Sequence, residues 1–457
     1  MSSAAAQAPP VDTSLRALLR LAGPIFVANA ALVGNGTVDT VMAGRLAAAD
    51  LAAVAIGLST YISVFMGLVG ILQALSPIAG HHFGARRFRQ VGFEVQQALW
   101  LAAGLTLVGV PLLAATPLWL GLARAEGEVA QIATGYLHAV AFGLPAALGM
   151  RVFIALNAAV SRPGVTMVVS LAALAAKVPL NALFMYGAGP VPALGGVGAG
   201  VSTTVIAWLS LAAYWALWRL DPAYAALRAK RLHGPERSAQ WRLIRLGVPI
   251  GLATLFEVTS FTFMAIFIAR IGTVAVAGHQ IVANLTALAF MIPLSLGIAT
   301  SVLVAQSLGA GHPRLARRAT LRGYRVGVGV AAVVAATLWL AREPLLGLYT
   351  ADPVVLGVAL GLIGYGAVFH VFDAMQAIGG FALRGYHVTF LPMVIYGVLL
   401  WAVGLGGGAW LAFQTTPFGP PMGAAGFWTG TTVGLIGAGA TLTALTLWVS
   451  GQRARSG

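Results

Sequence analysis

The sequence contains no cysteine, two lysines and 12 acidic residues among 457 positions. The absence of cysteine excludes a disulfide framework and any thiolate metal site. A phosphate-binding P-loop requires a Gly-Lys pair, whereas Lys177 and Lys230 both follow alanine, so the chain encodes no ATP-driven motor of that type. Acidic residues are so scarce that each one inside an apolar stretch needs an explanation.

Long apolar stretches fill most of the chain. Hydrophobic residues make up 59% of the sequence and charged residues 9%, and the mean hydropathy is +0.88. Soluble globular proteins have far more charge, and apolar runs of about 20 or more residues predict helices that cross a bilayer. Twelve spans are predicted, at residues 15–43, 50–80, 93–121, 131–158, 163–187, 196–219, 240–269, 276–308, 320–341, 355–383, 390–414 and 422–449. The predicted fold class is an all-α polytopic membrane protein with twelve transmembrane helices.

The net charge of +15 is carried mainly by alternate connections between the predicted spans. Cytoplasmic connections of membrane proteins are rich in Lys and Arg. The connections assigned to the cytoplasm hold Arg86, Arg87, Arg89, Arg162, Arg228, Lys230, Arg231, Arg237, Arg314, Arg317, Arg318, Arg322, Arg384, Arg453 and Arg455. Both termini are then cytoplasmic, and no soluble basic domain remains to bind nucleic acid. Arginine-rich, lysine-poor usage is typical of bacteria, so the predicted location is the bacterial inner (plasma) membrane.

The second half of the chain repeats the first. At an offset of 225 residues Gly23-Pro24-Ile25 aligns with Val248-Pro249-Ile250, and at an offset of 228 residues the stretch 194–205 aligns with 422–433. Each half holds six predicted spans, so both halves enter the membrane in the same orientation, as in duplicated transporters. We predict two six-helix lobes at 15–220 and 240–450, cytoplasmic tails at 1–14 and 451–457, and a cytoplasmic linker at 221–239.

Three carboxylates, Asp39, Glu257 and Asp373, lie inside long apolar stretches. An acid in a span costs about 2.5 to 3.5 kcal/mol and is seldom kept without a function. Glu257 and Asp373 lie near the predicted midplane of their helices. If they meet, the two like charges repel each other, and a bound hard cation or proton relieves the repulsion. The alternative is that each acid is neutral and hydrogen-bonded to a neighbouring helix.

Several motifs occur in order along the chain: Val-Asp-Thr-Val-Met-Ala-Gly at 38–44, Leu-Phe-Glu-Val at 255–258, Val-Ala-Gly-His-Gln-Ile at 276–281 and Leu-Arg-Gly-Tyr at 383–386. With the repeat, they resemble the multidrug and toxic compound extrusion (MATE) family in its bacterial NorM-type branch, over residues 15–450. The resemblance implies the MATE fold of two pseudo-symmetric six-helix lobes. It also implies cation-coupled antiport, in which Na⁺ or H⁺ enters as amphiphilic cationic drugs leave. Glu257 and Asp373 match the cation site of the second lobe, with Na⁺ as the metal ion it would hold.

The same resemblance assigns Asp39 and Asn181 to a polar network of the first lobe, which the family links to proton binding and bending of helix one. Lys177 departs from the family pattern, because an amide usually occupies this position. Residues 177 and 181 share one helix face, so the ammonium group would reach Asp39 and hold it ionised. The alternative is that Lys177 extends toward the cytoplasmic interface.

The first predicted helix contains features that weaken its hydrogen-bond ladder. Pro24, Gly34 and Gly36 all lie within it. Proline and glycine inside a span permit bending, which agrees with the movement of helix one that the resemblance implies.

Aromatic and thioether side chains provide candidates for a substrate cavity. Cation-π contacts and adaptable packing suit flat cationic amphiphiles. The alternative is ordinary packing between helices or against lipid. The candidates are Tyr61, Phe65, Met66, Phe290 and Met291.

Two other functions compete with drug antiport. A flippase for a lipid-linked saccharide also fits two six-helix lobes, but its pyrophosphate needs several basic groups, and Arg151 and Lys177 are the plausible intramembrane cations. A membrane-embedded enzyme needs a catalytic cluster on an accessible loop, and no such spacing appears. We therefore expect a secondary transporter rather than an enzyme, monomeric in the lipid bilayer. Its expected partners are small amphiphilic cations, with Na⁺ or H⁺ as coupling ion and no other cofactor.

Overall fold

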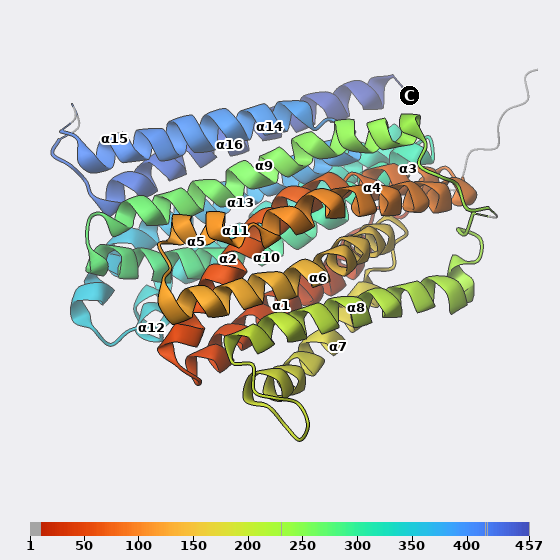
Figure 1. Cartoon of the computed structure of the whole chain (residues 1–457). Coiled ribbons are helices and arrows are strands. Elements are labelled where there is room, and N and C mark those ends of the chain that lie inside the picture. Colours follow the sequence, from red (N-terminus) through yellow and green to blue (C-terminus); the bar gives the residue numbers. More distant parts are fainter. Residues whose placement is uncertain (1–10, 230, 416, 418, 457) are drawn as a thin grey trace, which may run out of the picture. The chain divides into compact units, whose positions relative to one another are not determined.

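The computed structural model describes residues 11–229, 231–415, 417 and 419–456. These residues are almost entirely helical (Figure 1), and an isolated β-bridge pairs Ala188 with Val191. Residues 1–10 of the predicted N-terminal tail, Lys230 of the predicted linker and Gly457 of the predicted C-terminal tail lie outside the described residues.

The described residues contain twelve helical segments long and apolar enough to cross a membrane, which confirms the predicted number of spans. Helices from the first half are α1 (Leu15–Gly44), α2 (Ala48–Leu72), α3 (Leu75–Gly84), α4 (Phe88–Ala114), α5 (Thr116–Ala123), α6 (Gly127–Ala159), α7 (Pro163–Asn181), η1 (Ala182–Tyr186), α8 (Gly196–Leu220) and η2 (Pro222–Tyr224). Helices from the second half are α9 (Arg237–Ala269), α10 (Thr273–Gly309), α11 (Pro313–Leu340), α12 (Arg342–Gly347), α13 (Pro353–Gly385), α14 (Phe390–Tyr396), η3 (Gly397–Gly406), α15 (Gly407–Phe413) and α16 (Ala424–Arg455).

Several predicted spans differ in detail from the helices; the fifth, for example, ends in the π-helix η1. The second is divided into α2 and α3. The third, predicted at 93–121, begins earlier, at Phe88, and ends at Ala114. Pro117 has no N–H to continue this hydrogen-bond ladder, and it lies instead in the first turn of the separate helix α5. The eleventh contains the π-helix η3 between α14 and α15.

The helices group into two compact units that differ from the predicted lobes at their edges. The N-unit is Gly23–Gly251, and the C-unit consists of the described residues of Met1–Ala22 and Leu252–Gly457. Each of the equivalent helices α1 and α9 therefore belongs to both units. Pro24 of α1 and Pro249 of α9, which correspond at the 225-residue offset, lie close in sequence to the two boundaries.

In the N-unit, α6 packs against α2, α4 and α8. Its side chains include the buried Tyr136, Leu144 and Phe153. A glycine is needed where α2 meets α6, because a Cβ atom at Gly57 would lie 2.3 Å from the Tyr136 ring. Close approach without a side chain is the usual way in which membrane helices maximise packing.

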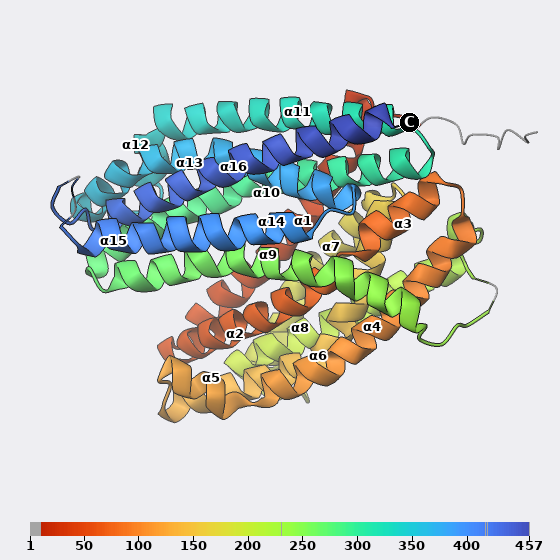
Figure 2. The same cartoon turned by 90° about the horizontal axis from the view of Figure 1, so that it is seen from above.

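In the C-unit, α10, α11, α13 and α16 lie side by side (Figure 2). The π-helix η3 and α15 pack on α16. The buried Phe427 and Trp428 of α16 lie in this layer. Trp428 contacts the ring of Phe369 on α13 with a centroid separation of 6.0 Å.

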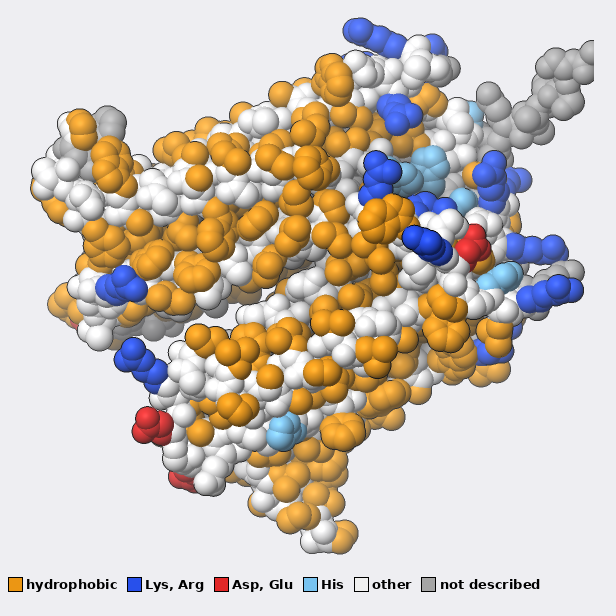
Figure 3. All heavy atoms as spheres, turned by 45° about the horizontal axis from the view of Figure 1, so that its top comes forward, with side chains coloured by type: hydrophobic (Ala, Val, Ile, Leu, Met, Phe, Trp, Pro, Cys, Tyr) orange, Lys and Arg blue, Asp and Glu red, His pale blue; other side chains and the backbone are white. Residues whose placement is uncertain are grey.

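The segment predicted as a linker is held along α4 within the N-unit. Gln97 donates to the carbonyl of Gly234 at 2.8 Å and accepts from the backbone N–H of Glu236 at 2.8 Å. Trp100 donates to the carbonyl of His233 at 3.0 Å. In Figure 3 hydrophobic side chains (orange) cover most of the visible surface, and most of the basic side chains (blue) gather toward the right of the view.

Candidate functional site

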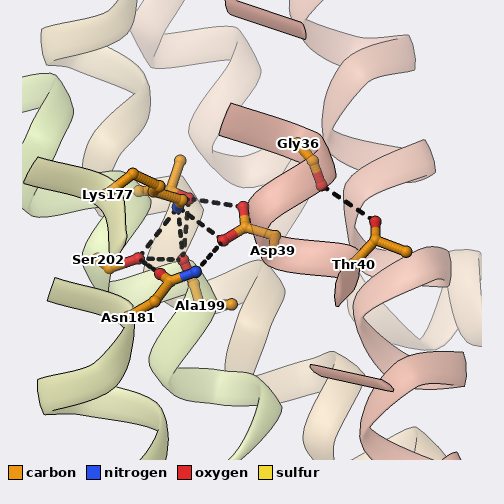
Figure 4. A network of polar contacts seen from close by, with 8 residues as sticks. Gly36, Asp39, Thr40, Lys177, Asn181, Ala199 and Ser202 are labelled. Carbon is orange, nitrogen blue, oxygen red and sulfur yellow. Dashed lines mark hydrogen bonds and ion pairs between the residues drawn. The ribbon is translucent and has the colours of Figure 1, made fainter. Parts of the chain in front are cut away.

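Asp39 of α1 lies in a buried polar cluster of the N-unit that also includes α7 and α8 (Figure 4). Lys177 Nζ is 2.8 Å from Asp39 Oδ1 and forms an ion pair with it. Asn181 Nδ2 donates to the same oxygen at 2.8 Å, and the Ser202 hydroxyl donates to Asn181 Oδ1. Asp39 is 3% exposed and Lys177 1% exposed, so the structure places the ammonium inside the protein rather than at an interface.

The ammonium of Lys177 has oxygen partners for all its protons. Its Nζ lies 2.6 Å from Thr203 Oγ1 and 3.0 Å from Ser202 Oγ, in addition to the Asp39 carboxylate. The carbonyl oxygen of Ala199 follows at 3.4 Å. An ammonium group has three N–H donors, so the nearer three oxygens satisfy it completely.

Local sequence explains how these side chains meet. Lys177 and Asn181 are four residues apart and therefore lie on one face of α7. The tight approach of α8 depends on Gly198, where a Cβ atom would lie 2.4 Å from the carbonyl oxygen of Phe184 in η1. This approach brings the adjacent turn of α8, with Ser202 and Thr203, toward the α7 side chains.

Glu257 of α9 and Asp373 of α13 belong to a second polar cluster, which lies in the C-unit. Gln376 joins them, because its Nε2 donates to Glu257 Oε1 and to Asp373 Oδ1, each at 3.0 Å. The Tyr396 hydroxyl of α14 donates to the backbone carbonyl of Gln376 at 3.5 Å. Asp373 is 6% exposed and Gln376 1% exposed.

The Gln376 amide has one end in use and one end free. Its Oε1 is buried and has no hydrogen-bond partner. Within the described residues, no three His, Cys, Asp or Glu side chains gather as metal ligands. The cluster therefore holds two carboxylates and one amide whose nitrogen faces the acids. Carboxylate and amide oxygens are hard ligands of the kind that bind small cations.

The sequence analysis identified the acids of both clusters, Lys177 and Asn181, but it missed the neutral partners Gln376, Ser202 and Thr203. Gln376 follows Asp373 by three residues, a spacing that places both side chains on one face of α13. Ser202 and Thr203 lie in the second aligned segment of the repeat, at 194–205. Helical spacing from Asp373 could have identified Gln376, whereas the repeat aligns Ser202 with Gly430 and does not single it out.

The proposed substrate-cavity residues are divided between the units. On α2, Tyr61 stacks on Phe65 with a centroid separation of 5.3 Å, and the Arg151 guanidinium lies 5.3 Å from the Phe65 ring centroid. Phe65 is buried, and Tyr61 and Met66 are half-buried. Their counterparts at 290 and 291 are half-buried residues of α10 in the C-unit.

The three residues associated with bending of helix one lie within α1, which is continuous from Leu15 to Gly44. A Cβ atom at Gly34 would lie 3.2 Å from Leu174 of α7. Gly36 is less constrained, because a Cβ atom there would be 3.8 Å from Leu58. The helix passes through Pro24 without a change of secondary structure.

Twelve candidate spanning helices, a duplicated chain and a buried acid cluster in each unit define a polytopic membrane transporter. The MatE family model matches the sequence twice, at residues 24–183 and 249–408. The two matches are displaced by 225 residues, the same offset as the aligned proline motifs. The chain belongs to the MatE family, in the bacterial NorM-like branch of MATE transporters.

Curated relatives resemble almost the whole chain. "Probable multidrug resistance protein NorM" from Aromatoleum aromaticum is 42% identical over 420 residues, 92% of this chain and 91% of the relative. "Multidrug resistance protein NorM" from Vibrio vulnificus is 36% identical and covers 95% of each chain. The fold is similar to the crystal structure of the eukaryotic MATE transporter AtDTX14, with a TM-score of 0.85, 21% identity and coverage of 97% and 100%.

Proposed function

We propose that this protein exports amphiphilic cationic drugs or toxic compounds by antiport, driven by entry of Na⁺ or H⁺ through alternating access of its two lobes. The names of its NorM relatives support multidrug export. The observation that carries the coupling mechanism is the joining of Glu257 and Asp373 through one Gln376 nitrogen. Two acids held this close favour a shared proton or a cation between them.

The Gln376 amide provides a way to exchange the ion. In the present geometry its N–H₂ group donates to both carboxylates. Rotation of the amide by half a turn would exchange its nitrogen with the unpartnered Oε1. That oxygen would repel the carboxylates unless a cation lay between them, so a bound Na⁺ would stabilise the rotated amide as a third oxygen ligand.

Antiport requires that ion and drug weaken each other's binding, and this coupling free energy is reciprocal. Neutralising Glu257 and Asp373 with an entering ion removes the negative charge that attracts a cationic drug. The membrane potential contributes about 2.3 kcal/mol per charge and 100 mV to ion entry. The coupling ion is a substrate of the cycle, since it is taken up on one side and released on the other.

The flippase alternative has less support from the intramembrane cations. Lys177 is paired with the Asp39 carboxylate, and Arg151 lies over the Phe65 ring. A lipid-linked pyrophosphate needs several basic groups, and the Asp39 carboxylate already neutralises one of these two. We therefore retain cation-coupled antiport as the proposed function.

The test uses purified full-length protein in liposomes loaded with ethidium. Efflux is followed under an inward Na⁺ gradient at equal pH, and separately under an inward H⁺ gradient without Na⁺. We expect at least one gradient to accelerate efflux, and Glu257→Gln and Asp373→Asn each to abolish the acceleration. Glu126→Gln is the matched control, because Glu126 is an exposed acid beside the start of α6.

Two results would contradict this proposal. If neither gradient accelerates efflux from well-folded protein, the antiport mechanism is wrong. If both acid variants keep the acceleration, the ion site is assigned to the wrong residues. Size-exclusion profiles of all variants show whether a lost response reflects misfolding.

A further inference from the structure

The oxygen atoms around Lys177 Nζ have the chemistry of a cation site. They comprise one carboxylate oxygen from Asp39, the hydroxyl oxygens of Ser202 and Thr203, and the carbonyl oxygen of Ala199, at 2.6 to 3.4 Å. Carboxylate, hydroxyl and carbonyl oxygens are the groups that bind hard cations in proteins. In this chain the cation at their centre is attached covalently to α7.

The surrounding contacts hold this arrangement in place. Asn181 and the Thr203 hydroxyl both contact the Asp39 carboxylate, at 2.8 Å and 3.5 Å. The Thr203 hydroxyl also lies 2.8 Å from Ala199 O. The Ser202 hydroxyl contacts Asn181 and the carbonyl of Ala199. Every residue that supplies an oxygen thus has a hydrogen bond besides the one to Lys177, or supplies the oxygen from its helix backbone.

The charges balance within the cluster. The buried ammonium and the buried carboxylate form a neutral pair. A free cation would have to displace the Lys177 ammonium from the three oxygens that satisfy its N–H donors. The displaced ammonium could not diffuse away, because its side chain is attached to α7. The cluster of Glu257 and Asp373 differs, because a neutral amide joins its two acids.

We propose that Lys177 is a resident cation that fills an oxygen-lined site in the N-unit, and that this site accepts a free small cation when the lysine ammonium is removed. The native protein then takes up its exchangeable ion in the C-unit cluster alone. That second statement rests on the proposed function, whereas the first does not. The ligand class of the emptied site is a primary alkylammonium or an alkali ion.

The main variant is Lys177→Ala, which removes three carbons and the ammonium nitrogen. The missing atoms have the composition of n-propylammonium, which is the probe. The thermal unfolding midpoint of the full-length protein in detergent is measured against n-propylammonium chloride, NaCl and tetramethylammonium chloride. We expect a saturable rise of several degrees with n-propylammonium in the variant, little effect of tetramethylammonium, and no rise in the wild type.

Two matched variants separate charge from volume. Lys177→Met fills the same space with an uncharged chain, so n-propylammonium should have no effect on it. Asp39→Asn combined with Lys177→Ala keeps the space but removes the carboxylate, and the rise should disappear. A rise in both controls, or no rise in Lys177→Ala, would overturn the inference.

If Lys177→Ala does not fold, Lys177→Gln is the second variant and Na⁺ the probe, because the longer side chain leaves room for a small ion only. We expect Na⁺ to raise the unfolding midpoint of this variant beyond its effect on the wild type, and the gain to require Asp39. Absence of that gain overturns the inference. These measurements follow binding rather than transport, so a failure of antiport in liposomes leaves their outcome unaffected.

Discussion

Gln376 Nε2 lies 3.0 Å from Glu257 Oε1 and thereby connects α13 to α9 within the C-unit. The same nitrogen lies 3.0 Å from Asp373 Oδ1. A neutral amide thus separates two acids that would otherwise face each other without a donor. This contact makes Gln376 a positioning residue of the proposed ion site, although it carries no charge.

We predict that Gln376→Leu weakens ion binding about 10-fold or more, since partners that orient ligands typically contribute 10- to 100-fold to metal affinity. Leucine keeps much of the side-chain volume but can neither donate to the carboxylates nor provide an oxygen. The measurement is the concentration of Na⁺, or the pH, that gives half-maximal ethidium efflux in liposomes.

Gln131→Leu is the control for this prediction, because Gln131 is an exposed amide on α6. It should leave the half-maximal concentration unchanged. An unchanged value in Gln376→Leu would mean that the two acids bind the ion without the amide.

The second prediction concerns an ion pair that fastens the start of α9 to α4 in the N-unit. Arg242 donates to Glu94 Oε1, and His82 Nε2 lies 3.6 Å from the same oxygen. Glu94 is fully buried, whereas the Arg242 side chain is 47% exposed. Removing one partner of a buried pair leaves an uncompensated charge. Because Arg242 is half in solvent, we expect Arg242→Met to lower the free energy of unfolding by about 1–3 kcal/mol.

Denaturation of the purified protein in mild detergent measures this loss. Combining Arg242→Met with Glu94→Gln removes both charges and should recover part of the stability. Equal losses in the single and double variants would show that packing of the arginine chain, rather than its charge, stabilises this contact.

Much of the fold follows from the sequence because a bilayer imposes a length on each apolar run. All twelve spans were therefore predicted, and the duplication was visible in motifs that contain Pro24 and Pro249. The division at Ala115 is not predicted, because hydropathy does not register that Pro117 has no N–H to continue the hydrogen-bond ladder of α4. The two compact units also divide within α1 and α9, near Pro24 and Pro249, whereas the predicted lobes keep each of these helices whole.

The site residues that the sequence predicts best are those whose side chains are energetically unfavourable inside an apolar helix. A buried acid or lysine is expensive in an apolar helix, so Asp39, Lys177 and Asp373 stand out in the sequence. The Thr203 hydroxyl costs little, since it can donate to the carbonyl of Ala199 four residues earlier in its own helix. Residues of this kind become functional candidates only when the structure shows what they face.

The last prediction is a pH dependence outside the spanning segments. Asp221 follows α8, accepts a hydrogen bond from the Ala223 backbone N–H at 2.8 Å, and pairs with Arg162 Nη2 at 2.7 Å. The Ala223 hydrogen bond and then the Arg162 guanidinium lower the pKa of Asp221 from its ordinary value of 3.8. A lowered pKa in the folded state means that the contact stabilises the protein above the unfolded-state value and is lost as the pH falls through the folded-state value.

Asp221→Asn should therefore be slightly less stable than the wild type by a constant amount between about pH 5 and 8, and the difference should shrink below about pH 4. The effect is small because both side chains are partly exposed to solvent. Thermal unfolding midpoints of the two proteins, measured across this range at fixed ionic strength, provide the comparison. Glu128→Gln, which alters an exposed acid in the first turn of α6, is the control for a general effect of one charge. If the difference between Asp221→Asn and wild type instead grew as the pH fell below 4, the carboxylate would be more basic in the folded protein than its contacts with Ala223 and Arg162 imply.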